Sequence, residues 1–145
     1  MSIGFTCSTF DLCHAGHIVM LRECKQVCDY LIVGLQVDPS KDRADKSAPS
    51  QSLVERYVQL SAIKYIDEIV PYEIEKDLED ILNMYEIDVR ILGEEYLEKD
   101  FTGKDICKKR GIALHFNKRD HRFSSTDLRE RITKMEIQNG HTRNG

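Results

Sequence analysis

Two histidines near the start of the chain, His14 and His17, are the residues whose type and spacing best suit chemistry. They follow a short apolar segment and precede an apolar run that begins at Ile18. A strand that led into a helix here would place both imidazoles at a helix N-terminus, where unpaired N–H groups and the helix dipole favour phosphate. The spacing puts both rings on one side of a helical turn, and Gly16 lets the backbone approach a ligand. The segment therefore predicts a site that binds phosphate.

A second polar cluster lies near the C-terminus. Arg119 and Arg122 precede three consecutive hydroxyl residues at the expected start of the last helix, namely Ser124, Ser125 and Thr126. Hydroxyls at a helix start commonly cap backbone N–H groups. Beside two arginines, the same groups could bind a polyphosphate instead. The residues alone leave both interpretations open.

The composition is typical of one soluble globular domain. Hydrophobic residues make up 41% and charged residues 32% of the 145 residues, which is enough for a single core. A net charge of −4 without a basic stripe argues against nucleic-acid binding. No apolar run reaches the length of a membrane span, and the N-terminus lacks the pattern of a signal peptide. We therefore expect no membrane partner and a cytoplasmic location.

The five cysteines are expected to be free thiols, because their number is odd and no secretory signal precedes them. Cys24 and Cys28 lie one turn apart on an expected helix. A zinc site would need a second Cys or His pair with suitable spacing, and none follows. We therefore expect both thiols in the core.

Strand-like and helical patterns alternate along the chain. The nearly continuous apolar run over residues 30–37 is typical of a strand covered on both faces. Expected strands cover residues 2–7, 30–37, 68–70, 89–92 and 113–116; expected helices cover 17–27, 77–85, 105–110 and 124–135, and a capping box opens another at Ser52. Pro71 is expected to end the third strand. Leu128, Ile132 and Met135 of the last helix are expected to face inward.

This alternation predicts an α/β fold, a Rossmann-like doubly wound parallel five-stranded sheet in a single domain over residues 1–135. Residues 136–145 are polar and are expected to form a disordered tail. Ligands of such sheets bind beyond the carboxyl ends of the strands. The long polar loop over residues 38–50 begins at that edge and is expected to be functional, with Lys41 and Arg43 in solvent.

Longer stretches around these clusters resemble a known family. Residues 8–17 resemble the G-T-F-D-L-L-H-x-G-H motif of the cytidylyltransferase branch of the H-x-G-H nucleotidyltransferase superfamily. Residues 119–126 resemble its R-T-E-G-I-S-T-T motif, and residues 88–96 resemble its D-V-x-x-x-G-D-D-W motif. Ser8 and Arg122 depart from the pattern, since each stands at a family glycine. Length and motif order are most similar to those of the small bacterial glycerol-3-phosphate cytidylyltransferases.

The resemblance implies transfer of a cytidylyl group from CTP to a small phosphorylated alcohol such as glycerol 3-phosphate, with release of pyrophosphate. The acceptor oxygen is already anionic, so catalysis reduces to positioning and charge neutralisation. Mg²⁺ bound mainly through the nucleotide phosphates is expected, as is a homodimer. Two alternatives remain: an adenylyltransferase of the same fold that acts on a sugar phosphate or flavin precursor, and a catalytically silent nucleotide-binding protein.

The resemblance also implies residue roles. Catalytic roles fall on His14, His17, Lys46 and Arg119, with Lys46 as a point charge on the flexible loop. Nucleotide contacts fall on Thr9, Phe10, Arg56, Gly93, Ser124, Ser125 and Thr126. Asp11 would either hold a histidine tautomer or turn the loop, and Arg56 would either contact the nucleotide or pair with Asp38. No side chain is assigned as a metal ligand.

Overall fold

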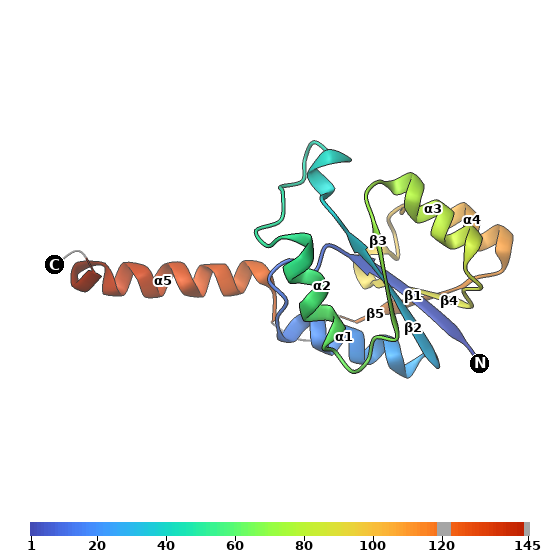
Figure 1. The fold of residues 1–145 in the computed structure, drawn as a ribbon, viewed down its shortest axis with the longest axis horizontal. Helices are drawn as coiled ribbons and strands as arrows, with labels where there is room; N and C mark the ends of the chain where they lie inside the picture. Colours follow the sequence, from blue (N-terminus) through green and yellow to red (C-terminus); the bar gives the residue numbers. More distant parts are fainter. Residues whose placement is uncertain (119–122, 144–145) are drawn as a thin grey trace.

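The computed structural model describes residues 1–118 and 123–143, and its centre is a five-stranded, all-parallel sheet (Figure 1). The strand order is β3-β2-β1-β4-β5. The strands are β1 (Ile3–Ser8), β2 (Tyr30–Gln36), β3 (Glu68–Tyr72), β4 (Val89–Gly93) and β5 (Ala113–Asn117). The helices are α1 (Ala15–Gln26), α2 (Leu53–Ser61), α3 (Glu75–Met84), α4 (Lys104–Arg110) and α5 (Ser125–Arg143), with short 3₁₀ turns η1 (Pro39–Lys41) and η2 (Glu94–Tyr96). The predicted Rossmann-like fold is confirmed.

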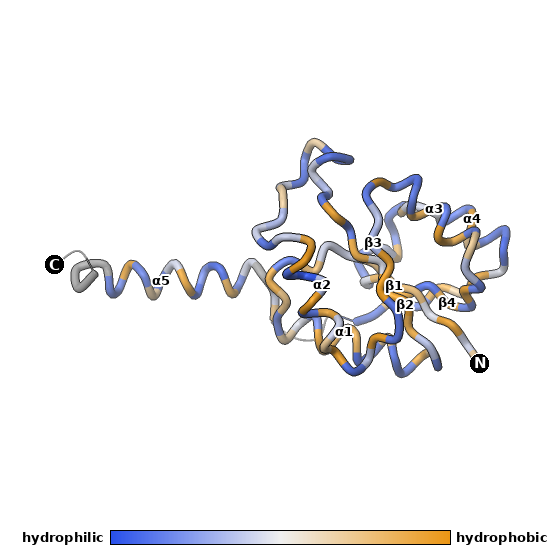
Figure 2. The backbone as a smooth tube through the Cα atoms, in the orientation of Figure 1, coloured by the Kyte–Doolittle hydropathy of each residue, from blue (hydrophilic) through white to orange (hydrophobic). Residues whose placement is uncertain are grey.

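The two faces of the sheet carry separate apolar cores. Phe5 and Ile32 pack with side chains of α3 and α4, whereas Leu31 and Val33 pack with side chains of α1 and α2. Alternate residues of one strand thus serve opposite faces, as strand geometry requires. Figure 2 shows the apolar residues gathered along the strands and the adjoining helices.

Cys24 of α1 and Cys28, two residues beyond the end of that helix, lie in the core, as expected. Cys24 is fully buried and Cys28 nearly so, and the Cys28 thiol donates to the Cys24 carbonyl oxygen at 3.3 Å. Burial raises the pKa of Cys24 to about 12, so this thiol stays protonated at neutral pH.

Pro71 does not end β3, because the strand continues through it to Tyr72. β3 lies at one edge of the sheet, and β2 is its pairing partner among the described strands. An edge strand has one side without ladder bonds, so a proline is tolerated there. The prediction failed because strand position within the sheet cannot be read from the local pattern.

The last helix is longer than expected and less buried. α5 continues to Arg143, across most of the stretch expected to be a disordered tail, and projects away from the sheet (Figure 1). Ile132 and Met135 are therefore 50% and 60% exposed, and the prediction that they face inward is wrong. Near the start of α5, Arg131 and Asp127 form an ion pair one turn apart at 3.2 Å, which stabilises the helix locally. Among the described residues, no helix combines the length and apolar character that crossing a membrane requires.

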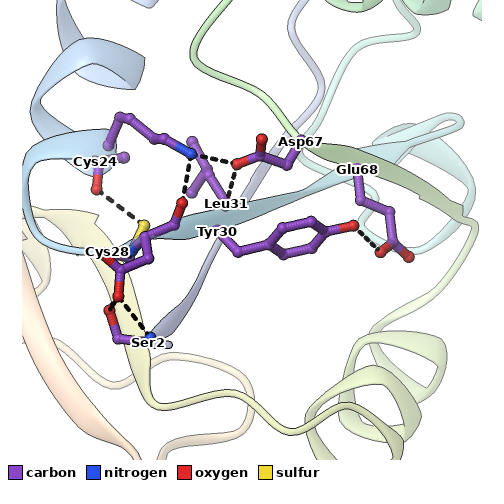
Figure 3. Close-up of polar contacts among 9 residues, drawn as sticks. Ser2, Cys24, Cys28, Tyr30, Leu31, Asp67 and Glu68 are labelled. Carbon is purple, nitrogen blue, oxygen red and sulfur yellow. Dashed lines mark hydrogen bonds and ion pairs between the residues drawn. The ribbon is translucent and has the colours of Figure 1, made fainter.

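Polar groups at the amino ends of the strands, here called the amino edge, are bonded to one another (Figure 3). The Asp67 carboxylate accepts from the Leu31 N–H at 2.8 Å and pairs with the Lys25 ammonium. The Tyr30 hydroxyl donates to Glu68 at 2.8 Å. Further along, the Asp88 carboxylate accepts from the Ile3 N–H at 2.8 Å. These bonds join the beginning of β2 to that of β3, and the beginning of β1 to that of β4.

Candidate active site

A cavity of about 610 Å³ opens at the carboxyl ends of the strands, here called the carboxyl edge. The final residue of every strand contributes to its wall: Ser8, Gln36, Tyr72, Gly93 and Asn117. The starts of α1 and α5 and part of the loop after β2 complete the wall. This is where ligands of parallel α/β sheets bind, as the sequence predicted.

The two histidines lie side by side in the cavity wall at the start of α1. Their ring centroids are 4.1 Å apart. His14 Nδ1 accepts from the Gly16 N–H at 2.9 Å, and His17 Nδ1 accepts from the His14 N–H at 3.2 Å. Because Nδ1 is an acceptor in both rings, the proton of each neutral ring lies on Nε2. The pair therefore presents two N–H donors at a helix N-terminus, an arrangement suited to an anion.

The loop between β1 and α1 is held in a conformation that most residues avoid. Phe10 and Leu12 have φ values of +53° and +52°, although neither is glycine. The Phe10 ring is buried and lies 5.5 Å from the His17 ring, centroid to centroid. Phe10 is absent from the cavity wall, so the geometry gives it a supporting contact with His17 in place of the expected nucleotide contact.

Asp11 fastens this loop to the segment that precedes α2. Its carboxylate accepts from the N–H groups of Ser50 and Gln51, each at 2.9 Å. Burial alone would raise the pKa of Asp11, but these bonds lower it below its ordinary value. The histidine Nδ1 atoms are bonded to backbone, so of the two roles expected for Asp11 the structure shows the loop-holding one.

Arg56 does not reach the cavity. It is 2% exposed, and its guanidinium donates to four carbonyl oxygens, those of Thr9, Gln36, Val37 and Gln51. Asp38 takes its own bonds from Ser40. Neither expected role, a nucleotide contact or an ion pair with Asp38, is therefore seen. Arg56 instead joins the ends of β1 and β2 to the start of α2.

The loop after β2 brings Lys46 to the cavity wall, as its expected role requires. Arg43, expected in solvent, also lines the cavity and pairs with Glu75 at 2.6 Å. The Glu75 N–H donates to Asp42 at 3.1 Å. Lys41 is exposed, as predicted. Arg43 and Asp42 thus hold the loop against the start of α3.

The start of α5 meets the start of α1. A Cβ added at Gly16 would lie 2.8 Å from the Phe123 carbonyl oxygen, so only glycine allows this approach. Ser124 and Thr126 line the cavity. The Ser124 hydroxyl accepts from the Asp127 N–H at 2.9 Å, which is the capping role.

The other residues of this predicted phosphate-binding cluster lie outside the part of the chain that the structure describes. Arg119 and Arg122 lie outside the described residues, as does the side chain of Ser125. Their expected contacts with phosphate therefore stay predictions.

β4 contributes two residues to the cavity wall. Gly93 lines the cavity as predicted, and a Cβ there would lie 2.6 Å from Glu95 Oε1, so the Glu95 side chain folds over bare backbone. Arg90, which the sequence analysis did not select, also lines the cavity and is only 3% exposed. A lone charge inside an apolar strand was the signal that could have revealed it.

Comparisons with known proteins agree with this geometry. The family model described as cytidylyltransferase-like matches residues 5–131. Glycerol-3-phosphate cytidylyltransferase of Bacillus subtilis (strain 168) is 34% identical over 131 residues, covering 90% of this chain and 96% of that protein. Bifunctional protein HldE of Campylobacter jejuni subsp. jejuni is 36% identical over 108 residues, covering 74% of this chain but only 23% of that protein.

The fold is also similar to that of a solved structure. The lipopolysaccharide core biosynthesis protein from Thermoplasma volcanium GSS1 superposes with a TM-score of 0.64 at 26% identity, covering 81% of this chain and 95% of that one. Since the family model spans most of the chain and the Bacillus relative matches along nearly its whole length, this chain belongs to the cytidylyltransferase-like family.

Proposed function

We propose that this protein transfers a cytidylyl group from CTP to a small phosphorylated alcohol, with glycerol 3-phosphate as the expected acceptor. The observation that carries the proposal is the histidine pair, whose Nδ1 atoms both accept backbone N–H bonds, at the carboxyl edge where the starts of α1 and α5 meet. Family membership and the similarity to the Bacillus enzyme support the choice of reaction and acceptor.

In this reaction an anionic oxygen of the acceptor phosphate attacks the α-phosphorus of CTP. The bond from that phosphorus to the bridging oxygen breaks, and pyrophosphate leaves. The attacking oxygen needs no base, so the protein acts by positioning both substrates and stabilising charge. We assign His14 and His17 to the α-phosphate and Lys46 to charge on the departing pyrophosphate.

The resemblance assigns the β- and γ-phosphates to Arg119 and the hydroxyls at the start of α5. Ser124 and Thr126 line the cavity, which supports this assignment for that helix start. Backbone N–H groups there favour an anion in the same way as those of α1.

Mg²⁺ is expected to accompany the nucleotide, and it would neutralise charge on the phosphates. Glu95 and Asp100 line the cavity and offer carboxylate oxygens, the ligands that Mg²⁺ prefers. We expect most of its ligands to be phosphate oxygens and water.

A homodimer and a cytoplasmic location remain part of the proposal. Light scattering should give twice the chain mass of 16.8 kDa, and a single-chain mass at all concentrations would contradict the dimer.

Pyrophosphate release tests the function. The assay supplies CTP or ATP with Mg²⁺ and a panel of phosphorylated alcohols, and we expect CTP with glycerol 3-phosphate to be fastest. A site that hydrogen-bonds one base edge can discriminate by about 10⁴-fold in good cases. Preference for ATP would establish an adenylyltransferase instead. Nucleotide binding without release, for every acceptor, would indicate a silent binding protein.

A further inference from the structure

A buried arginine whose side chain reaches the cavity wall has fewer partners among the described residues than its charge requires. Arg90 lies inside β4, where its neighbours Val89 and Ile91 are apolar. Its guanidinium carbon lies 4.9 Å from the centroid of the Phe101 ring, and Nη1 donates to the Thr102 carbonyl oxygen. Nη1 would also lie 3.1 Å from a Cβ added at Gly103. The 101–103 segment therefore fixes the guanidinium in place.

The charge of Arg90 has no counter-ion among the described residues. No carboxylate oxygen of residues 1–118 or 123–143 lies within the 4.0 Å that defines an ion pair, and the bond to Thr102 is the only hydrogen bond. Glu75, which shares the cavity, is already paired with Arg43. Burial, with a smaller effect from Cys7, raises the pKa of the nearby Tyr72, so its phenol is neutral.

The second buried arginine makes the contrast clear. Arg56 is equally buried but donates to four carbonyl oxygens and lies outside the cavity wall. Arg90 donates to one described carbonyl oxygen, that of Thr102, and lies in the cavity wall. A buried cation is costly unless it is paired, and no described carboxylate pairs with Arg90, so its place in the cavity wall suits an anionic ligand.

Arg90 and the histidines approach the cavity from opposite faces of the sheet. The 101–103 segment that holds Arg90 leads into α4, whose side chains pack on the same face as those of α3. His14 opens α1, which covers the other face. If the nucleotide phosphates lie at the histidines, Arg90 is placed for the other substrate.

We propose that Arg90 binds an anionic group of the acceptor substrate. This inference rests on the proposed cytidylyl transfer. It requires that the bound acceptor place a phosphate or a carboxylate within hydrogen-bonding distance of the Arg90 guanidinium. The planar guanidinium suits either oxyanion, because it can donate two parallel N–H bonds. The group bound is either the reacting phosphate or a second anion at the far end of the acceptor.

The experiment compares two acceptors that differ in one group. Glycerol 3-phosphate ends in a hydroxymethyl group, and 3-phosphoglycerate ends in a carboxylate. KM for each acceptor and for CTP is measured in the wild type and in Arg90→Met, with binding of both acceptors followed by calorimetry. Arg110→Met is the matched control, because Arg110 also donates to a backbone carbonyl, that of Asn83, but lies outside the cavity wall.

We expect Arg90→Met to raise the KM of the acceptor by about tenfold or more, the size of a charge-assisted bond, and to leave the KM of CTP within about twofold. Equal weakening of both acceptors would identify the reacting phosphate as the bound group. Weakening of 3-phosphoglycerate alone would identify the carboxylate. An unchanged acceptor KM, or a rise confined to CTP, would overturn the proposal.

Two further measurements keep the test decisive. If Arg90→Met does not fold, Arg90→Lys takes its place: it keeps the charge but loses the planar fork, so acceptor binding must still weaken severalfold. If neither acceptor supports pyrophosphate release, the proposed function fails on its own. Calorimetry of glycerol 3-phosphate and 3-phosphoglycerate then still shows whether Arg90 binds them.

Discussion

The amino and carboxyl edges of the sheet contain similar charged residues in different states. At the amino edge, Asp67 and Asp88 accept bonds from backbone N–H groups, and Lys25 pairs with Asp67. In the wall of the cavity that opens at the carboxyl edge, the Arg90 side chain is buried with one hydrogen bond among the described residues, and the two histidine rings lie side by side.

Backbone strain follows the same division. The described non-glycine residues with positive φ are Phe10 and Leu12, and both lie in the loop after β1 at the carboxyl edge. Strain of this kind persists only where the surrounding structure holds it, and it clusters at functional sites. The comparison indicates that the charged groups of the amino edge bond to one another and to backbone, whereas the carboxyl edge combines strained backbone with polar groups that line a cavity.

The largest expected effect is on catalysis at the carboxyl edge. His17→Ala removes an imidazole that we assign to the α-phosphate, and loss of one preorganised donor costs about 3–4 kcal/mol of transition-state stabilisation. We expect kcat for pyrophosphate release to fall by a factor of hundreds, with much weaker changes in nucleotide binding. Near-native kcat at saturating substrates would show that His17 is not catalytic.

Arg56 sharpens the comparison because it is a structural residue at the carboxyl edge. Arg56→Met leaves four carbonyl oxygens without their donor, and part of that loss is recovered by water. We expect the free energy of unfolding to fall by about 2–3 kcal/mol. Urea denaturation measures this, with Arg110→Met as control. A variant as stable as the wild type would contradict the role assigned to Arg56.

Asp67 tests the amino edge. Asp67→Asn removes the ion pair with Lys25 and weakens the bond from the Leu31 N–H, but the side chain is 31% exposed, so solvent screens part of the effect. We expect a loss of about 1 kcal/mol of unfolding free energy, with kcat unchanged. A large fall in kcat without loss of stability would contradict the claim that the amino edge serves stability and not catalysis.

The smallest effect is on the pH dependence of stability. Burial alone would raise the pKa of Asp67, but the bonds from Lys25 and Leu31 lower it below its ordinary value. A lowered carboxyl pKa stabilises the folded state above the unfolded pKa of about 3.9, and this stability is lost as pH falls through the folded pKa. Below about pH 4, the free energy of unfolding should therefore fall less steeply with decreasing pH in Asp67→Asn than in the wild type. If both proteins lost unfolding free energy equally steeply with falling pH, Asp67 would not contribute to the acid dependence of stability.

Much of the architecture was predictable because it depends on local pattern. The apolar run of β2 and the Ser52–Glu55 capping box each predict an element that the structure confirms. The histidine spacing likewise predicted two rings on one side of a helix start. The end of β3 and the exposure of α5 were not predictable, because both depend on position within the whole fold.

The site was predictable to a lesser degree. Motif similarity brought out the histidines, Lys46 and Gly93, all of which line one cavity. Motif similarity could not tell that Arg56 donates to four carbonyl oxygens of the protein, nor that Arg90, at a variable motif position, lines the cavity. The roles of arginines depend on which acceptors surround them, and that information is three-dimensional.

Phosphorus NMR of one reaction mixture tests the central claim most directly. Wild-type protein, Asp67→Asn and His17→Ala are each incubated with CTP, glycerol 3-phosphate and Mg²⁺. We expect the wild type and Asp67→Asn to form pyrophosphate and a cytidine diphosphate ester of glycerol in equal amounts, and His17→Ala to form almost none. Release of phosphate without the ester, or full product from His17→Ala, would contradict the account.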